Sequence, residues 1–125
     1  MADTPENRVK KKITKKMKAL GVRYIKAYPG GMYGSNGTLD SFYCINGYHV
    51  GIEAKAKYNK VTALQQYDIN NLLDANGFAM VINEKNIGII DEVVPVLYNG
   101  THKEIEQLRQ KLRNLFYVSI DKVLK

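Results

Sequence analysis

The sequence has few of the residues that build disulfide, zinc and histidine-based sites. It contains one cysteine, Cys44, and two histidines, His49 and His102, in 125 residues. A single thiol forms no intramolecular disulfide and supplies no thiolate zinc site. No serine signature surrounds either histidine, so neither a nucleophilic triad nor a histidine-metal nuclease motif is supported. We interpret both histidines as ordinary surface residues.

Long apolar runs are also missing. Residues 1–6 contain no apolar signal core, and no stretch approaches the roughly 20 apolar residues of a membrane-spanning helix. With the single cysteine, this predicts a reduced, cytoplasmic setting and no membrane partner. Apolar residues make up 45% of the chain and charged residues 25%, which is typical of globular proteins. The length predicts one domain spanning residues 1–125, large enough for a real core.

Acidic residues are scarce relative to basic ones. The chain has 19 Lys and Arg against 12 Asp and Glu, a net charge of +7 and a pI near 9.4. This balance favours a polyanionic partner, most simply nucleic acid. Much of the excess lies between residues 8 and 18, and our candidates for binding phosphates there are Lys11, Lys12, Lys15 and Lys16. The alternative is a solvated basic face.

The same basic segment has the features of a helix. Thr4 fits the N-cap, Pro5 fits the first helical position, and Gly21 is a natural end. A buried stripe is predicted from apolar residues at helical spacing, namely Val9, Ile13, Met17 and Leu20. Glu6 extends that stripe toward the N-terminus. Either it approaches a metal site, or it is an acid favoured in a first turn by the helix dipole.

Residues 40–55 predict a β-hairpin that brings two acids together. Asn46-Gly47 is the strongest short turn signal, because a type I′ turn needs positive φ at both central residues. Counting outward from this turn pairs Asp40 with Glu53, and directly opposite residues have Cβ atoms roughly 4.5–5.5 Å apart. Lys55 lies two residues after Glu53 and therefore on the same face.

Two carboxylates and a lysine on one face suit phosphodiester hydrolysis. Carboxylate oxygens bind hard divalent cations such as Mg²⁺ or Mn²⁺, which lower the pKa of a bound water and neutralise phosphate charge. Asp40 and Glu53 are the candidate metal ligands. Lys55 is the candidate for orienting or activating the attacking water, or for stabilising developing negative charge. The alternative is a surface hairpin with solvated acids.

The remaining pattern predicts an α/β domain. Strands are expected at residues 22–28, 78–82 and 87–90, and a loop at residues 29–37 leads into Asp40. Thr62 fits the cap of a helix at about residues 63–76, with an apolar side of Leu64, Ile69, Leu72 and Leu73. Another helix is expected from Thr101 to about residue 115, with a stripe of Ile105, Leu108, Leu112 and Leu115. The predicted order is α-β-β-β-α-β-β-α, a mixed central β-sheet flanked by helices.

A glutamine pair at the start of the second helix lies close after the Lys55 strand. Gln65 falls in the first helical turn, where its amide can bind a metal water, the scissile phosphate or Lys55. Gln66 is the neighbouring alternative.

The order of these residues resembles a known nuclease family. Asp40 followed by Glu53-Ala54-Lys55 resembles the core signature of the PD-(D/E)XK nuclease superfamily, and Thr62-Ala63-Leu64-Gln65, a helix and Gly77 resemble its VRR-NUC branch. The resemblance covers about residues 4–90 and leaves a C-terminal helical extension at about 91–125. Many family members have Gly-x-Pro-Asp at the first acid, whereas this chain has Gly37-Thr38-Leu39-Asp40.

The resemblance implies a restriction-endonuclease-like fold and further site residues. It implies that the backbone carbonyl of Ala54 adds a metal ligand and that Glu6 and Gln65 support the site. Small stand-alone members resemble this chain in length. From them we expect a homodimer that cuts branched DNA such as Holliday junctions, in a bacterial or phage-infected host cell.

The sequence therefore predicts a Mg²⁺-dependent deoxyribonuclease, an endonuclease with Asp40, Glu53, Lys55, Gln65 and Glu6 in its catalytic site. Two alternatives stay open. One is a non-catalytic nucleic-acid-binding module that uses the lysine-rich N-terminal helix. The other is a flap or restriction-like nuclease on the same fold.

Overall fold

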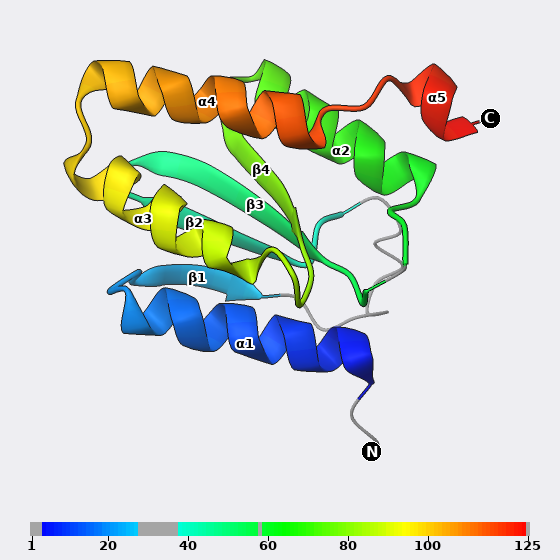
Figure 1. Cartoon of the computed structure of the whole chain (residues 1–125), viewed down its shortest axis with the longest axis horizontal. Coiled ribbons are helices and arrows are strands. Elements are labelled where there is room, and N and C mark those ends of the chain that lie inside the picture. The colour runs from blue at the N-terminus through cyan, green and yellow to red at the C-terminus, as the bar shows by residue number, and fades with distance from the viewer. Residues whose placement is uncertain (1–3, 28–37, 58, 125) are drawn as a thin grey trace.

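A mixed four-stranded sheet with helices packed around it forms the centre of the molecule (Figure 1). The structure is a computed structural model that describes residues 4–27, 38–57 and 59–124. Its elements follow in the order α1 (Pro5–Ala19), β1 (Tyr24–Ala27), β2 (Ser41–Ile45), β3 (Tyr48–Ala54), α2 (Ala63–Asp74), β4 (Phe78–Ile82), η2 (Ile87–Ile89), α3 (Ile90–Asn99), α4 (His102–Phe116) and α5 (Ile120–Leu124). The predicted mixed α/β class is confirmed. The loop predicted at residues 29–37 lies outside the described residues.

Helix α1 begins and ends where the sequence predicts. The Thr4 hydroxyl accepts a hydrogen bond from the backbone N–H of Asn7 at 3.1 Å, which is a side-chain N-cap. Gly21 adopts φ +84° just beyond the helix, a conformation that favours glycine. Val9, Ile13 and Met17 are buried, so this stripe fixes the helix against the sheet.

The hairpin of β2 and β3 has the predicted register. Asn46 and Gly47 have φ of 52° and 84°, as a type I′ turn requires, and Tyr43 pairs with Val50. The paired residues run from Ile45–Tyr48 to Ser41–Ile52. β1 pairs antiparallel with β2, and β4 pairs parallel with β3. This topology places β3 in the interior of the sheet, between β2 and β4 (Figure 1).

The predicted strand at residues 87–90 is wrong. These residues form the 3₁₀ turn η2 and the first residue of α3. The Asn86 side chain accepts from the Asn83 N–H at 2.8 Å and donates to the Val81 carbonyl at 2.8 Å, so the chain turns directly after β4. A short apolar run does not distinguish strand from helix. The buried residues instead continue at helical spacing into Ile90, Val93, Val94 and Leu97.

Two predicted apolar positions are also wrong, Leu64 in α2 and Leu115 in α4. Their exposed fractions are 57% and 54%. In α2 the buried face carries the amides of Gln66 and Asn70 instead. Gln66 Nε2 donates to the carbonyl of Phe116 at 2.9 Å, and Asn70 Nδ2 donates to that of Val118 at 2.7 Å. The segment after α4 crosses α2 here, and these amides satisfy its carbonyl groups.

Helix α4 otherwise matches its prediction. Ile105, Leu108 and Leu112 are buried and complete the core on the β4 side of the sheet. Within the described residues, none of the helices is both long and apolar enough to span a membrane.

Candidate active site

The first acid, Asp40, sits one residue before β2 and reaches across to the end of β3. Its Oδ2 accepts a hydrogen bond from the backbone N–H of Ala54 at 2.8 Å. The strand pairing ends at Ser41–Ile52, so Asp40 and Glu53 are not a ladder pair as predicted. The Asp40 carboxylate is instead tied to the residue that follows Glu53. The two acids are nevertheless neighbours at one edge of the hairpin, as the predicted register implies.

Glu53 is the most unusual side chain of the site. It is 1% exposed, although it carries a carboxyl group. Oε2 accepts from Gln65 Nε2 at 3.0 Å and lies 3.5 Å from Lys55 Nζ. Oε1 is buried and has no hydrogen-bond partner among the residues that the structure describes. A buried carboxyl oxygen without a partner is rare, because its lost hydration is not replaced.

The surroundings of Glu53 oppose its ionisation in the metal-free protein. Burial is the largest cause, the nearby negative charge of Asp40 is the second, and Lys55 opposes both only in part. Together they raise the pKa of Glu53 from 4.5 to about 8. The negative charge of Glu6 raises this pKa slightly further. A cation placed between Asp40 and Glu53 would remove this cost, which makes the acid pair a favourable position for positive charge.

Gln65 is held in place by the first turn of α2. Its Oε1 accepts from the Thr62 N–H at 2.9 Å, and the Thr62 hydroxyl accepts from the Gln65 N–H at 3.1 Å. This capping box fixes the amide with its Nε2 directed at Glu53. Gln66, the alternative from the sequence, is turned away and buried against the segment after α4. The structure therefore selects Gln65 as the glutamine at the acids.

Lys55 follows the acids as the alternation along β3 predicts. Its Nζ lies 3.5 Å from Glu53 Oε2, and its side chain is 12% exposed. Its backbone N–H donates to the carbonyl of Ile82 at 2.9 Å, which extends the pairing with β4 beyond the strand. The ammonium is thus positioned by the interior of the sheet rather than by a surface loop.

Helix α1 contributes a lysine that the sequence reasoning did not assign to the site. Lys10 Nζ lies 3.3 Å from Asp40 Oδ1 and 3.9 Å from Glu6 Oε2. Its side chain is 22% exposed, so the pair with Asp40 is partly shielded from water. Glu6 therefore lies on the same side of α1 as Lys10, and its charge acts on Glu53; its role in the site stays a prediction. The four-residue spacing of Glu6 and Lys10 was a usable signal, because such residues share a helix face.

A small cavity of about 30 Å³ lies beside Asp40. Its lining comes from α1, the hairpin and the last residue of β1: Lys10, Ile13, Thr14, Ala27, Asp40, Ser41 and Ala54. About one water fits in a space of this size. The acid site therefore has a small void directly next to a carboxylate, on the side of α1.

The donor set fits a hard divalent cation with an incomplete protein shell. Within the described ranges, no group of three or more His, Cys, Asp or Glu side chains is close enough to hold a metal ion. Mg²⁺ is usually held by one or two carboxylates, with waters and substrate phosphates completing its shell. Asp40 and Glu53 match that number, and the unpartnered Oε1 of Glu53 is an available ligand atom.

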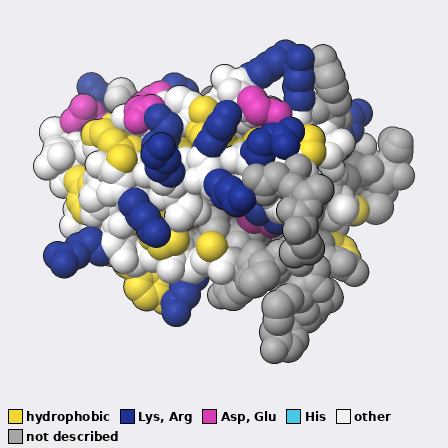
Figure 2. Space-filling view, turned by 90° about the horizontal axis from the view of Figure 1, so that it is seen from below, with side chains coloured by type: hydrophobic (Ala, Val, Ile, Leu, Met, Phe, Trp, Pro, Cys, Tyr) yellow, Lys and Arg dark blue, Asp and Glu magenta, His cyan; other side chains and the backbone are white. Residues whose placement is uncertain are grey.

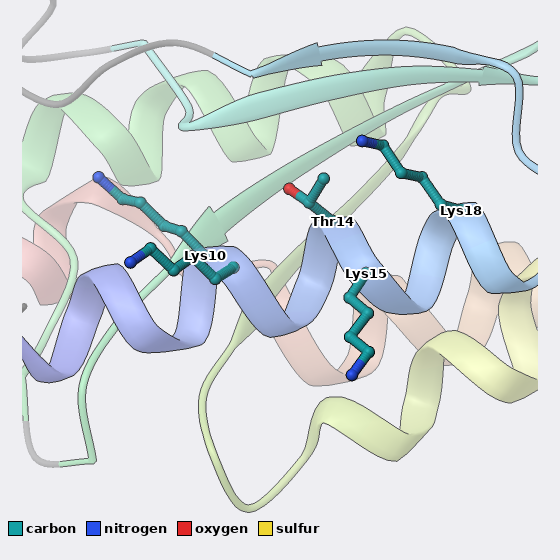
Figure 3. Close-up of a pocket in the computed structure, with 5 residues that line it drawn as sticks. Lys10, Thr14, Lys15 and Lys18 are labelled. Atoms are coloured by element: carbon teal, nitrogen blue, oxygen red, sulfur yellow. The ribbon is translucent and has the colours of Figure 1, made fainter.

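The four lysines predicted to bind nucleic acid divide between two sides of α1. Lys11 and Lys15 line a surface hollow together with Lys10, Thr14 and Lys18 (Figure 3), and Lys15 also borders the hollow on the α3 side. Lys12 and Lys16 line a second hollow toward α3, where Lys16 Nζ pairs with Asp91 Oδ2 at 2.7 Å. Figure 2 looks onto the α1 side, where Lys and Arg side chains are spread widely and acids lie mainly along the upper edge.

Both histidines are exposed, as expected, and neither lies among the residues of the acid site. The His49 ring stacks on Phe42 with 5.3 Å between centroids. Comparison of the chain with family models, curated proteins and solved structures finds no match.

Proposed function

We propose that this protein is a metal-dependent endonuclease that hydrolyses phosphodiester bonds in DNA. The observation that carries the proposal is the Glu53 carboxyl group, buried beside Asp40 and Lys55 with Oε1 unpartnered. Burying an acid next to another acid lowers stability, and such arrangements are concentrated at functional sites. A divalent cation together with a phosphate would balance these charges, and the cation would give Glu53 Oε1 a partner.

Asp40 and Glu53 would hold Mg²⁺ or Mn²⁺ through their carboxylates, and the Ala54 carbonyl would add a ligand. When bound, the ion supplies a water of lowered pKa and neutralises charge on the phosphate. The Ala54 N–H orients the Asp40 carboxylate by donating one hydrogen bond to its Oδ2 at 2.8 Å. Lys10 balances the charge of Asp40 from the α1 side.

Lys55 and Gln65 would act on the reacting groups. Lys55 Nζ is the ammonium nearest to Glu53, and from there it would orient the attacking water or stabilise charge that develops on the phosphate. Gln65 holds Glu53 Oε2 through its Nε2, so it fixes the rotamer of the buried acid. Glu6 supports the site through Lys10.

The preferred substrate is branched DNA such as a Holliday junction, cut by a homodimer with one site per subunit. This part of the proposal rests on the resemblance to small VRR-NUC proteins. One active site per subunit suits paired cuts on a symmetric junction. The rival proposal, a non-catalytic DNA-binding module, is favoured by the lysines of α1 and would leave the buried Glu53 beside Asp40 without a role.

Cleavage of a substrate panel tests the proposal. Duplex, flap, fork and four-way-junction DNA are incubated with the protein in Mg²⁺, in Mn²⁺ and in EDTA. We expect cleavage with either metal and none in EDTA, with the four-way junction cut fastest. Binding without cleavage of any substrate in either metal would support the binding module and contradict the nuclease. Preferred cleavage of the flap would keep the nuclease and replace the junction.

A further inference from the structure

A hollow on α1 has a lining of almost uniform charge. It encloses about 430 Å³ and is lined by Lys10, Lys11, Thr14, Lys15 and Lys18. Four of these five side chains are lysines and the fifth has a hydroxyl group, so no carboxylate of the described residues lines the hollow. In Figure 3, Thr14 and Lys18 point from α1 toward the strands, whereas Lys15 points to the opposite side. We call this feature the α1 hollow.

The α1 hollow continues into the acid site. Lys10 and Thr14 line both the hollow and the small cavity beside Asp40. Glu6, Lys10, Thr14 and Lys18 recur every four residues and so follow one ridge of the helix. Each step along this ridge rises about 6 Å, which separates the Cα atoms of Lys10 and Lys18 by about 12 Å. The ridge leads from the acids to an exposed ammonium.

The α3 side of the same helix differs in charge. Its hollow includes Asp91, and Lys16 is paired with that acid at 2.7 Å. Helix α3 also begins with two acids, Asp91 and Glu92. A phosphate that approached Lys12 and Lys16 would meet these negative charges. The seven basic residues of residues 8–18 are therefore not equivalent, although the sequence presents them as one cluster.

The chemistry of the α1 hollow matches a phosphodiester backbone. Ammonium groups and a hydroxyl donate hydrogen bonds to phosphate oxygens without reading a base. The ridge of about 12 Å is long compared with the roughly 3.4 Å of helix axis per phosphate of one DNA strand. The ridge is therefore long enough to contact more than one phosphate, which suits a nucleic-acid strand better than a single phosphate ion.

We propose that the α1 hollow binds the backbone phosphates that adjoin the cleaved bond, so that the DNA strand leaves the acid site along the β1 side of α1. The inference rests on the proposed nuclease function and specifies where its substrate lies. It replaces Lys12 and Lys16 by Lys10 and Lys18 as phosphate-binding residues and keeps Lys11, whereas Lys15 borders both hollows and points away from the strands in Figure 3.

Two double variants on the same helix test this placement. Lys11→Gln/Lys18→Gln removes two charges from the α1 hollow, and the matched control Lys12→Gln/Lys16→Gln removes two from the α3 side. Gln keeps helix propensity close to that of Lys, and circular dichroism verifies that both variants fold. Binding of a fluorescently labelled synthetic duplex DNA is measured in EDTA over a range of salt concentrations, so the readout does not depend on cleavage.

We expect the hollow variant to bind several-fold more weakly, with a log–log salt slope smaller by about 1–2, because each lost phosphate contact removes about 0.9. The control should bind within about two-fold of wild type, and Lys11→Arg/Lys18→Arg should restore binding, since it keeps both charges. Equal losses in both Gln variants, or no loss in either, would overturn the placement. Failure of the wild type to cleave any substrate would instead contradict the nuclease.

Discussion

Glu53 concentrates the chemistry of the site in one residue. Glu53 lies on β3, and its two side-chain partners are Gln65 from α2 and Lys55 from the residue after β3. Because β3 lies in the interior of the sheet, this carboxyl group is shielded from solvent, and Asp40 places a second negative charge beside it. The protein maintains an arrangement that lowers its own stability whenever the acid ionises, which is expected where function requires the ionised form.

Stability of the metal-free protein should decrease as pH rises. The folded chain keeps a proton on Glu53 between its unfolded pKa of 4.5 and its folded pKa of about 8, where the unfolded chain has lost it. Because the folded state binds more protons there, its stability falls with rising pH, by at most about 5 kcal/mol for this shift. Denaturant unfolding in EDTA at pH 6 and pH 9 covers the upper part of this window and should show a decrease of at most about 3 kcal/mol.

Glu53→Gln should remove most of that dependence and make the metal-free protein more stable than wild type at pH 9. Glu104→Gln, which changes an exposed acid at the start of α4, is the control and should keep the wild-type dependence. Parallel pH curves for wild type and Glu53→Gln would show that Glu53 ionises normally.

Lys55 should affect turnover and not binding. Lys55→Ala removes the ammonium that lies 3.5 Å from Glu53 Oε2. Assistance to proton transfer typically contributes about 10²–10⁴-fold, so a rate loss of that order is expected in single-turnover cleavage at saturating Mg²⁺. Lys55→Arg should restore little, because arginine stays protonated and its planar group has a different reach. Lys60→Ala, an exposed lysine, should leave the rate unchanged; a rate for Lys55→Ala within a few-fold of wild type would exclude Lys55 from the mechanism.

The pairing of residues across the hairpin was predictable from the sequence, because the position of the turn fixes which residues face each other. Once Asn46-Gly47 fixed the turn, alternation placed Lys55 with Glu53, and both positions agree with the structure. The direct Asp40–Glu53 pairing was not realised because β2 begins at Ser41. Lys10 was missed because its pair with Asp40 joins two elements whose packing no local pattern states.

At the scale of elements, the capping boxes connect local structure to the site. Helices α2 and α4 both begin with a threonine that exchanges hydrogen bonds with the residue three positions on. In α2 that residue is Gln65, which also donates to Glu53, whereas in α4 it is Glu104, which is fully exposed. The same motif therefore stabilises the start of both helices, and in α2 it also positions the Gln65 amide at Glu53.

Thr62→Ala and Thr101→Ala form a matched pair. Each removes one capping hydroxyl and should cost about 1 kcal/mol of unfolding free energy. Only Thr62→Ala should also slow cleavage, because losing the hydrogen bond from the Gln65 N–H to the Thr62 hydroxyl loosens the helical turn that carries the amide contacting Glu53. Denaturant unfolding and single-turnover cleavage are measured on both. Identical cleavage by the two variants would show that the α2 cap has no part in positioning Gln65.

Element boundaries were predictable where capping chemistry was strong. Thr4, Pro5, Thr62 and Thr101 each mark a helix start that the structure confirms. The apolar run at residues 87–90 was predicted to be a strand, because four residues are too few to distinguish the periodicity of a strand from that of a helix. The asparagine hydrogen bonds that turn the chain after β4 depend on the final position of Val81, which the sequence does not reveal.

On the scale of the whole molecule, the sheet, α1 and α2 converge on one edge of the hairpin. β3 carries Glu53 and Asp40 lies just before β2, while α1, drawn below the sheet in Figure 1, carries Lys10, and α2 carries Gln65. The mixed α/β class followed from the alternating apolar patterns. The division of the basic residues between two sides of α1 did not, because it depends on where α3 places Asp91.

Cleavage by wild type and by two carboxylate variants, measured side by side, tests the central claim most directly. Four-way-junction and duplex DNA are each incubated with wild type, Asp40→Asn and Glu53→Gln in Mg²⁺, and binding is measured separately in EDTA. The account predicts cleavage by wild type alone, with all three proteins folded and bound to DNA. Full cleavage by both variants would contradict it, because neither carboxylate would then hold the metal.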